Sequence, residues 1–175
     1  MARALDLARL LDGAIRPVEA AAAYEAAIAR ENPEVDAFLD LAVLYFECCD
    51  GGYADYHRLS AEFVSFAWGR CMSVLDEAER RFGIHPEVIF WRNYFAIFLR
   101  GSRAFVPLCE GLVSDGRSLV PALHLFVESG GRQWRREAHE LLQSVRLGAT
   151  ERQRYIKSVL ESHSLLPIGD GERTE

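Results

Sequence analysis

The sequence has no long uninterrupted apolar run and very little lysine. A transmembrane helix needs about 20 consecutive apolar residues, and no window reaches that length, so we expect no membrane partner. Asp6 and Asp12 interrupt the apolar pattern of the N-terminal segment, which argues against a signal peptide. Lys157 is the only lysine among 20 basic residues. This preference for arginine, together with abundant alanine, indicates a GC-rich bacterial genome.

The common motifs of metal and catalytic sites are also missing. The sequence contains no CxxC, HExxH or GxSxG motif and no phosphate-binding loop. Two pairs of possible metal ligands are present: His124 with Glu128, four residues apart on a helix, and the adjacent His139 and Glu140. Each pair supplies only two ligands, whereas a metal site needs three or four. We therefore expect no metal and no other cofactor, and an enzyme only if distant residues assemble a site in space.

The four cysteines show no regular disulfide spacing. Cys48, Cys49, Cys71 and Cys109 all stand in apolar surroundings, which is typical of buried free thiols. Free thiols predict a reducing compartment, the cytoplasm. The adjacent pair Cys48 and Cys49 leaves a soft-metal or redox site open as an alternative.

Charge is distributed unevenly along the chain. Residues 1–90 contain 16 acidic and 8 basic residues, whereas residues 91–175 contain 10 acidic and 12 basic ones. Nucleic-acid binders usually carry a concentrated basic face, so nucleic acid is an unlikely partner for this acidic chain. The arginines around Trp134, including Arg135, form a local exception.

Two segments are apolar around most of a helix. In residues 35–49 the charged side chains of Asp36, Asp40 and Glu47 fall within an arc of about 40° at 100° per residue. Residues 88–100 form a second segment of this kind. Helices with so little polar surface must be covered by neighbours, so the sequence predicts two buried helices.

The remaining segments also have helical spacing, and no period-two strand pattern is sustained. Further helices are expected near residues 3–12, 17–30, 54–82, 132–146 and 151–163, with short proline-containing helices between 101 and 131. The segment 54–82 is either one long helix or two that bend at Gly69. The prediction is one all-α domain of about eight or nine helices over residues 1–166, with a disordered tail over 167–175.

Part of this pattern resembles the tetratricopeptide repeat, a stack of antiparallel helical hairpins. The second helix of a repeat and its exit are resembled by Ala20, Tyr24, Ala27 and Pro33. The first helix of the next repeat is resembled by Phe38, Leu41, Ala42 and Tyr45. A weaker match follows: Cys71, Leu75, Ala78 and Pro86, then Trp91, Tyr94, Phe95 and Phe98. The resemblance covers residues 17–100, with irregular spacing between the two matches. A compact bundle with another arrangement is the alternative.

The resemblance implies a concave groove lined by the first helix of each hairpin. Leu39, Val43, Arg92 and Asn93 would then be placed to touch a bound segment. Packing of the last third of the chain against Leu39 and Val43 would remove these two from the groove.

Two charged features have more than one interpretation. Arginines flanking Trp134 can contact an anionic partner, or Trp134 can pack inward while the arginines pair with Glu137 and Glu140. The acidic stripe on residues 35–49 can hold a cation, remain a solvated edge, or pair with Arg92 and Arg100 on the other buried helix.

These observations favour a module that binds another protein or a peptide. The alternative is an inhibitor or immunity-type protein whose acidic first half masks a basic partner. An enzyme without a local motif is the third candidate. The sequence does not indicate the oligomeric state.

Overall fold

Ten α-helices and no strand make up the described part of the chain, which is residues 4–100 and 105–163 of the computed structural model, without the side chains of residues 99 and 100. The helices are α1 (Ala4–Gly13), α2 (Pro17–Ile28), α3 (Val35–Cys48), α4 (Gly51–Tyr56), α5 (Ala61–Phe82), α6 (Pro86–Arg100), α7 (Phe105–Ser114), α8 (Ala122–Glu128), α9 (Arg135–Ser144) and α10 (Glu151–Ser162). The predicted all-α class is confirmed, with slightly more helices than expected.

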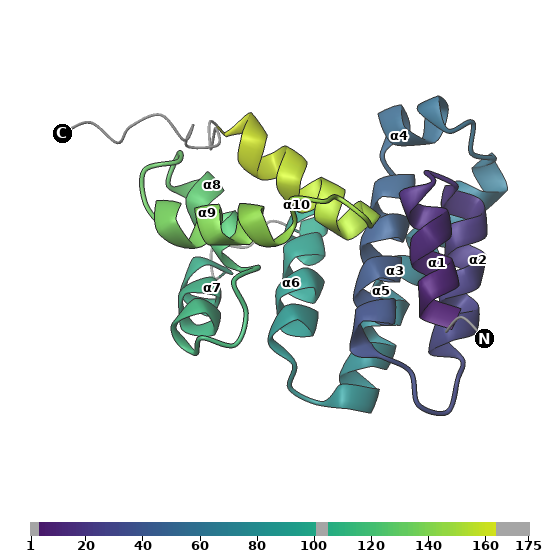
Figure 1. Cartoon of the computed structure of the whole chain (residues 1–175), viewed down its shortest axis with the longest axis horizontal. Coiled ribbons are helices and arrows are strands. Elements are labelled where there is room, and N and C mark those ends of the chain that lie inside the picture. The colour runs from purple at the N-terminus through teal and green to yellow at the C-terminus, as the bar shows by residue number, and fades with distance from the viewer. Residues whose placement is uncertain (1–3, 101–104, 164–175) are drawn as a thin grey trace.

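The helices form a row that the last helix bridges (Figure 1). α1 packs along α2, α2 along α3, α3 along α5, and α5 against α6. The short helices α7, α8 and α9 lie beyond α6, and α10 runs back from them to contact α3. The end of the chain therefore covers the helix at the centre of the row.

Side-chain caps explain where several helices begin. Asp50 accepts a hydrogen bond from the Tyr53 N–H at 2.9 Å and starts α4, a short helix between the predicted helices over residues 35–49 and 54–82. Ser60 caps α5 in the same way. α5 begins later than predicted and continues through Gly69 as one helix.

The cap of α10 is close to a capping box, with the second bond shifted to the residue before the N-cap. Thr150 accepts the Gln153 N–H at 3.4 Å, while the Gln153 side chain reaches back to accept the Ala149 N–H at 2.8 Å. α10 accordingly begins at Glu151.

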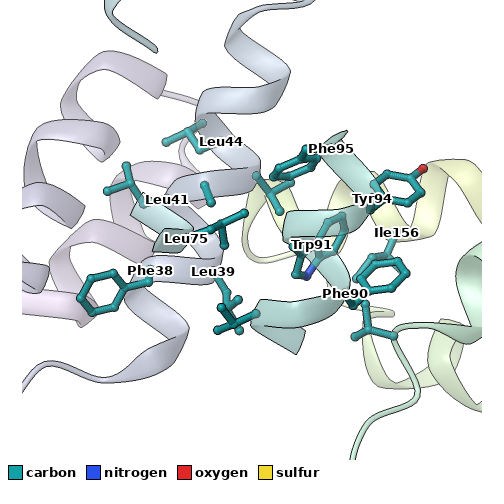
Figure 2. Close-up of a cluster of buried hydrophobic side chains, with 14 of the residues drawn as sticks. Phe38, Leu39, Leu41, Leu44, Leu75, Phe90, Trp91, Tyr94, Phe95 and Ile156 are labelled. Carbon is teal, nitrogen blue, oxygen red and sulfur yellow. The ribbon is translucent and has the colours of Figure 1, made fainter. Parts of the chain in front are cut away.

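The two predicted apolar helices, α3 and α6, form the centre of the core. Leu39, Val43 and Trp91 have no exposed surface, and Figure 2 shows Leu39 and Leu75 in one cluster with Trp91 and Phe95 of α6. Because α3 is covered by α2, α5, α6 and α10, its apolar side chains are buried on several sides. Each such side chain contributes about 1.5–3 kcal/mol to folding.

The acidic stripe of α3 is bound by arginines from distant parts of the chain. Nε of Arg152 lies 2.8 Å from Asp40, its NH2 2.9 Å from Asp36, and its NH1 2.9 Å from Glu87. Arg9 of α1 contacts the two aspartates as well. We call these five residues the Arg152 cluster. Of the three interpretations of the acidic stripe, pairing with Arg92 is not found, because the Arg92 side chain binds Asp76 and Glu79.

A second buried network fixes the start of α10 to α1. Asp12 accepts hydrogen bonds from the Tyr24 hydroxyl at 2.9 Å, the Glu151 N–H at 2.9 Å and the Arg154 guanidinium at 2.6 Å. Arg154 also binds the Glu151 carboxylate at 2.8 Å. The two networks together attach α10 to α1, α3 and α6.

Some predictions fall outside these observations. The expected disordered tail, residues 167–175, and the expected pairing through the side chain of residue 100 lie outside the described residues. The helical-repeat resemblance stays a prediction. Among the helices that the structure describes, none combines the length and apolar character required to cross a bilayer.

Candidate functional site

A cleft of about 490 Å³ opens where α3, α5, α6 and α10 meet. We call it the aromatic cleft, after the side chains that line it: Phe46, Glu47, Cys49, Asp50, Trp68, Cys71, Met72, Phe95, Phe98 and Tyr155. Because the cleft draws residues from four helices, its shape depends on α10 being held in place.

The inner wall of the aromatic cleft is a group of packed rings. Phe46 and Phe95 stack with centroids 4.2 Å apart and planes 10° apart. Tyr155 meets the Phe46 ring edge-on at 6.1 Å, and its hydroxyl lies 2.8 Å from the Tyr94 hydroxyl. Such pairs hold each ring in a defined orientation, so this wall is rigid.

The rim of the cleft carries large aromatic side chains that remain exposed. Trp68 of α5 is 58% exposed and Phe98 of α6 is 62% exposed. Ala67 and Cys71, the neighbours of Trp68 that belong to the buried stripe of α5, face the core instead. Exposed aromatic residues beside a concave surface are typical of binding sites.

Glu47 is one of two carboxylate residues that line the aromatic cleft, with Asp50. Its half-buried carboxylate has no hydrogen-bond or ion-pair partner among the described residues, in contrast to Asp40 in the Arg152 cluster. Burial, reinforced by the nearby charges of Glu151 and Asp50, raises the pKa of Glu47 to about 7. A carboxylate held this way is typical of functional sites.

The cysteines of the cleft have little nucleophilic character. Burial raises the pKa of the Cys49 thiol to about 11 and that of Cys71 to about 12. Each thiol donates to a backbone carbonyl, of Tyr45 and Ala42 respectively. Since the thiolate is the reactive form, neither thiol is a ready nucleophile near neutral pH.

Metal-ligand geometry is not found in the described ranges. No three His, Cys, Asp or Glu side chains within residues 4–100 and 105–163 gather closely enough to hold a metal ion. His124 packs against the Phe105 ring at 4.6 Å, and burial lowers its pKa. All four cysteines are free, and Cys48, Cys71 and Cys109 are buried.

The four groove residues expected from the repeat resemblance are spread over two environments. Leu39 and Val43 are fully buried in the core and present no surface to a ligand. Arg92 is exposed on α6 and binds Asp76 at 2.9 Å and Glu79 at 3.2 Å. The exposed side chain of Asn93 donates to the Ile89 carbonyl.

The other two predicted residues lie at the start of α9. Trp134 is half-buried, has φ of 60°, and lines a separate cleft of about 530 Å³ with residues that include Glu110, Glu128 and Arg132. Arg135 donates to the Gly131 carbonyl at 2.9 Å. The neighbouring guanidinium of residue 136 lies near two carboxylates, those of residues 137 and 140.

None of the six predicted residues lines the aromatic cleft. Trp68 stands three residues before Cys71 and seven before Leu75, at the edge of the buried stripe of its helix, so its place in the sequence does not distinguish it from a core residue. In the sequence Glu47 is one member of the acidic stripe, and in the structure the other two members, Asp36 and Asp40, are paired with Arg152.

Comparison with known proteins found no matching family model, no similar curated protein and no similar solved structure.

Proposed function

We propose that the protein is an interaction module that binds a segment of another protein, or a peptide, in the aromatic cleft. The observation that carries this proposal is the pair of exposed rings, Trp68 and Phe98, at the rim of a cleft in which the Glu47 carboxylate has no partner from the described part of the chain. The free thiols favour a reducing cytoplasm as its location.

The composition of the cleft supports binding more than catalysis. Its volume of about 490 Å³ lies in the range of ligand sites, which are mostly apolar with a few placed polar groups. Aromatic side chains, tryptophan above all, supply much of the binding energy at protein interfaces. The ionisable groups at the cleft are carboxylates, a phenol and neutral thiols, which offer no pair of acid and base poised around a reacting atom.

The alternative function, an inhibitor of a basic partner, requires a dense acidic patch on the surface of this protein. Several acidic residues of the first half are already bound to arginines, among them Glu25 and Glu77 to Arg70 and Asp36 to Arg152. We therefore favour the cleft over an acidic face.

Site-specific photo-crosslinking tests the proposal. A benzophenone amino acid is placed at Trp68, and as a control at Ile84, which is 81% exposed outside the cleft. Both variants are irradiated in cells of the source organism, and the cross-linked peptides are identified by mass spectrometry. We expect one recurring peptide at position 68 that is absent at position 84.

A synthetic copy of that peptide is then titrated against the protein. It should bind the unmodified chain and lose at least about tenfold in affinity with Trp68→Ala, because hot-spot aromatics at interfaces commonly contribute this much or more. Cross-linking at position 68 that matches the control, or equal affinity for the Trp68→Ala variant, would overturn the proposal.

A further inference from the structure

We infer that the aromatic cleft takes an arginine side chain of the bound segment, with the Glu47 carboxylate as counter-ion and the surrounding rings as its walls. This inference rests on the proposed function and names the chemistry by which the partner is recognised.

The charge of the cleft is the first argument. Three carboxylates lie at or near it, but two have partners: Glu151 binds Arg154 at 2.8 Å, and Asp50 caps α4 through the Tyr53 N–H. Glu47 alone has no partner among the residues the structure describes. An entering cation meets an uncompensated negative charge, whereas an anion is repelled by it.

The second argument is the cost of covering Glu47. Above about pH 7, where Glu47 is ionised, a neutral apolar ligand would remove the remaining water from this carboxylate, which must then take up a proton or remain as an unpaired buried charge, and both are unfavourable. A cationic ligand supplies both the opposite charge and donors. The cleft therefore discriminates against neutral apolar groups of similar shape.

The third argument is the aromatic surround. The cleft presents Trp68 and Phe98 at its rim and the stacked rings of Phe46 and Phe95 on its wall. Cations are attracted to ring faces, most strongly to tryptophan. A planar guanidinium stacks on such rings and can donate two parallel hydrogen bonds to one carboxylate, which an ammonium cannot do. This combination selects arginine over lysine.

Four pentapeptides test the inference by calorimetry: acetyl-Ala-Leu-X-Leu-Ala-amide, with arginine, lysine, citrulline or glutamate at X. Citrulline has nearly the shape of arginine without its charge. We expect the arginine peptide to bind about tenfold or more tightly than the citrulline peptide, followed by lysine, with glutamate weakest. Glu47→Gln should remove most of the difference between arginine and citrulline.

Matched variants make the result specific to the cleft. Glu62→Gln changes an exposed carboxylate in the first turn of α5 and should leave all four affinities unchanged. Trp68→Ala should weaken both the arginine and the citrulline peptides.

Failure of the inference can be told from failure of the proposed function. Equal binding of arginine and citrulline peptides, both lost with Trp68→Ala, would overturn the arginine inference and leave a peptide-binding cleft. If the arginine peptide does not bind at all, the inference is also overturned. The proposed function is tested separately, by the cross-linking at position 68. Free arginine that binds as tightly as the peptide would contradict the inference, because the occupant would then be a small molecule.

Discussion

Nε of Arg152 lies 2.8 Å from Oδ1 of Asp40, a carboxylate with no exposed surface. The first residue belongs to the last helix and the second to the middle of α3, so this contact ties the end of the chain to the centre of the core. Asp36 and Glu87 bind the other two nitrogens of the same guanidinium. Because Tyr155 of α10 lines the aromatic cleft, the Arg152 cluster also helps to hold the candidate site together.

Replacement of Arg152 by methionine should destabilise the protein strongly. Methionine keeps an apolar stem but leaves Asp40 with Arg9 as its remaining guanidinium partner. Loss of one partner from a buried ion pair costs about 3–5 kcal/mol, and we expect about 3 kcal/mol in the free energy of unfolding, measured by urea denaturation.

Two further variants control this measurement. Arg146→Met, at an exposed position, should change the free energy of unfolding by less than about 0.5 kcal/mol. Addition of Asp40→Asn to Arg152→Met should restore part of the loss, because it removes the buried charge. A loss below about 1 kcal/mol for Arg152→Met would show that the cluster does not fix α10.

This relationship shows where sequence reasoning reached its limit. The helical period of residues 35–49 correctly predicted a buried helix and placed Asp36 and Asp40 on one side of it. Their partner stands 112 residues from Asp40, on a helix whose packing no local pattern specifies. Arg92 looked suitable from its position on the other buried helix, but in the fold it faces Asp76 and Glu79.

Substitutions of Trp91 compare two effects on stability: the loss of buried volume and the removal of an unsatisfied hydrogen-bond donor. It is fully buried, and its indole N–H has no hydrogen-bond partner among the described residues. Trp91→Phe removes this unsatisfied donor along with some volume, so the two effects partly offset each other and the loss should be about 1 kcal/mol. Trp91→Ala leaves a large cavity and should cost about 3–5 kcal/mol. Chemical denaturation of both variants gives the comparison, and a loss with Phe close to that with Ala would contradict it.

Two glycines should respond oppositely to alanine. Gly131 has φ of +74°, and a Cβ there would lie 3.2 Å from the carbonyl oxygen of His163 and 3.3 Å from the Phe126 ring. Gly131→Ala should therefore lower the melting temperature, with a cost of about 1–3 kcal/mol.

Gly111 serves as the matched control for this change. It lies inside α7, and a Cβ there meets nothing within 4 Å. Gly111→Ala should raise stability by about 0.5–1 kcal/mol, as alanine does in a helix interior. Calorimetric melting curves that shift in the same direction for both variants would disagree with the backbone geometry described above.

Glu47→Gln should stabilise the protein in a pH-dependent manner. The folded-state pKa of about 7 lies above the unfolded value of about 4.3, so the folded state disfavours the charged form. The loss of folding stability caused by the ionised Glu47 is absent below about pH 4.5, grows between about pH 4.5 and 7, and reaches its full value above about pH 7.

The size of this gain follows from the surroundings of Glu47. After allowance for solvent screening we expect about 1–2 kcal/mol at pH 8 and almost none at pH 4. Among the described residues, the ionisable groups around it supply no positive charge: Asp50, Glu151, Cys48, Tyr94 and Tyr155. Urea denaturation at several pH values measures the gain, and a gain independent of pH would mean that Glu47 ionises normally.

The candidate site was less accessible to sequence reasoning than the fold. The apolar pattern gave the two central helices, but a cleft between four helices depends on how far apart their axes lie, which the pattern does not contain. Phe46 and Phe95 read as ordinary core residues, and in the structure they are the cleft wall. Trp68 stands at the edge of the apolar stripe of its helix, where helical spacing does not separate a rim residue from a core residue.

Carboxyl-carbon NMR titration of Glu47, with and without the arginine pentapeptide, tests the central claim most directly. In the free protein the pKa should lie near 7, and saturation with the arginine peptide should lower it by at least about one unit, because a bound guanidinium stabilises the charged form. A Glu47 pKa that stays the same on saturation, or that changes equally with the citrulline peptide, would contradict the assignment of this carboxylate as the counter-ion of a bound arginine.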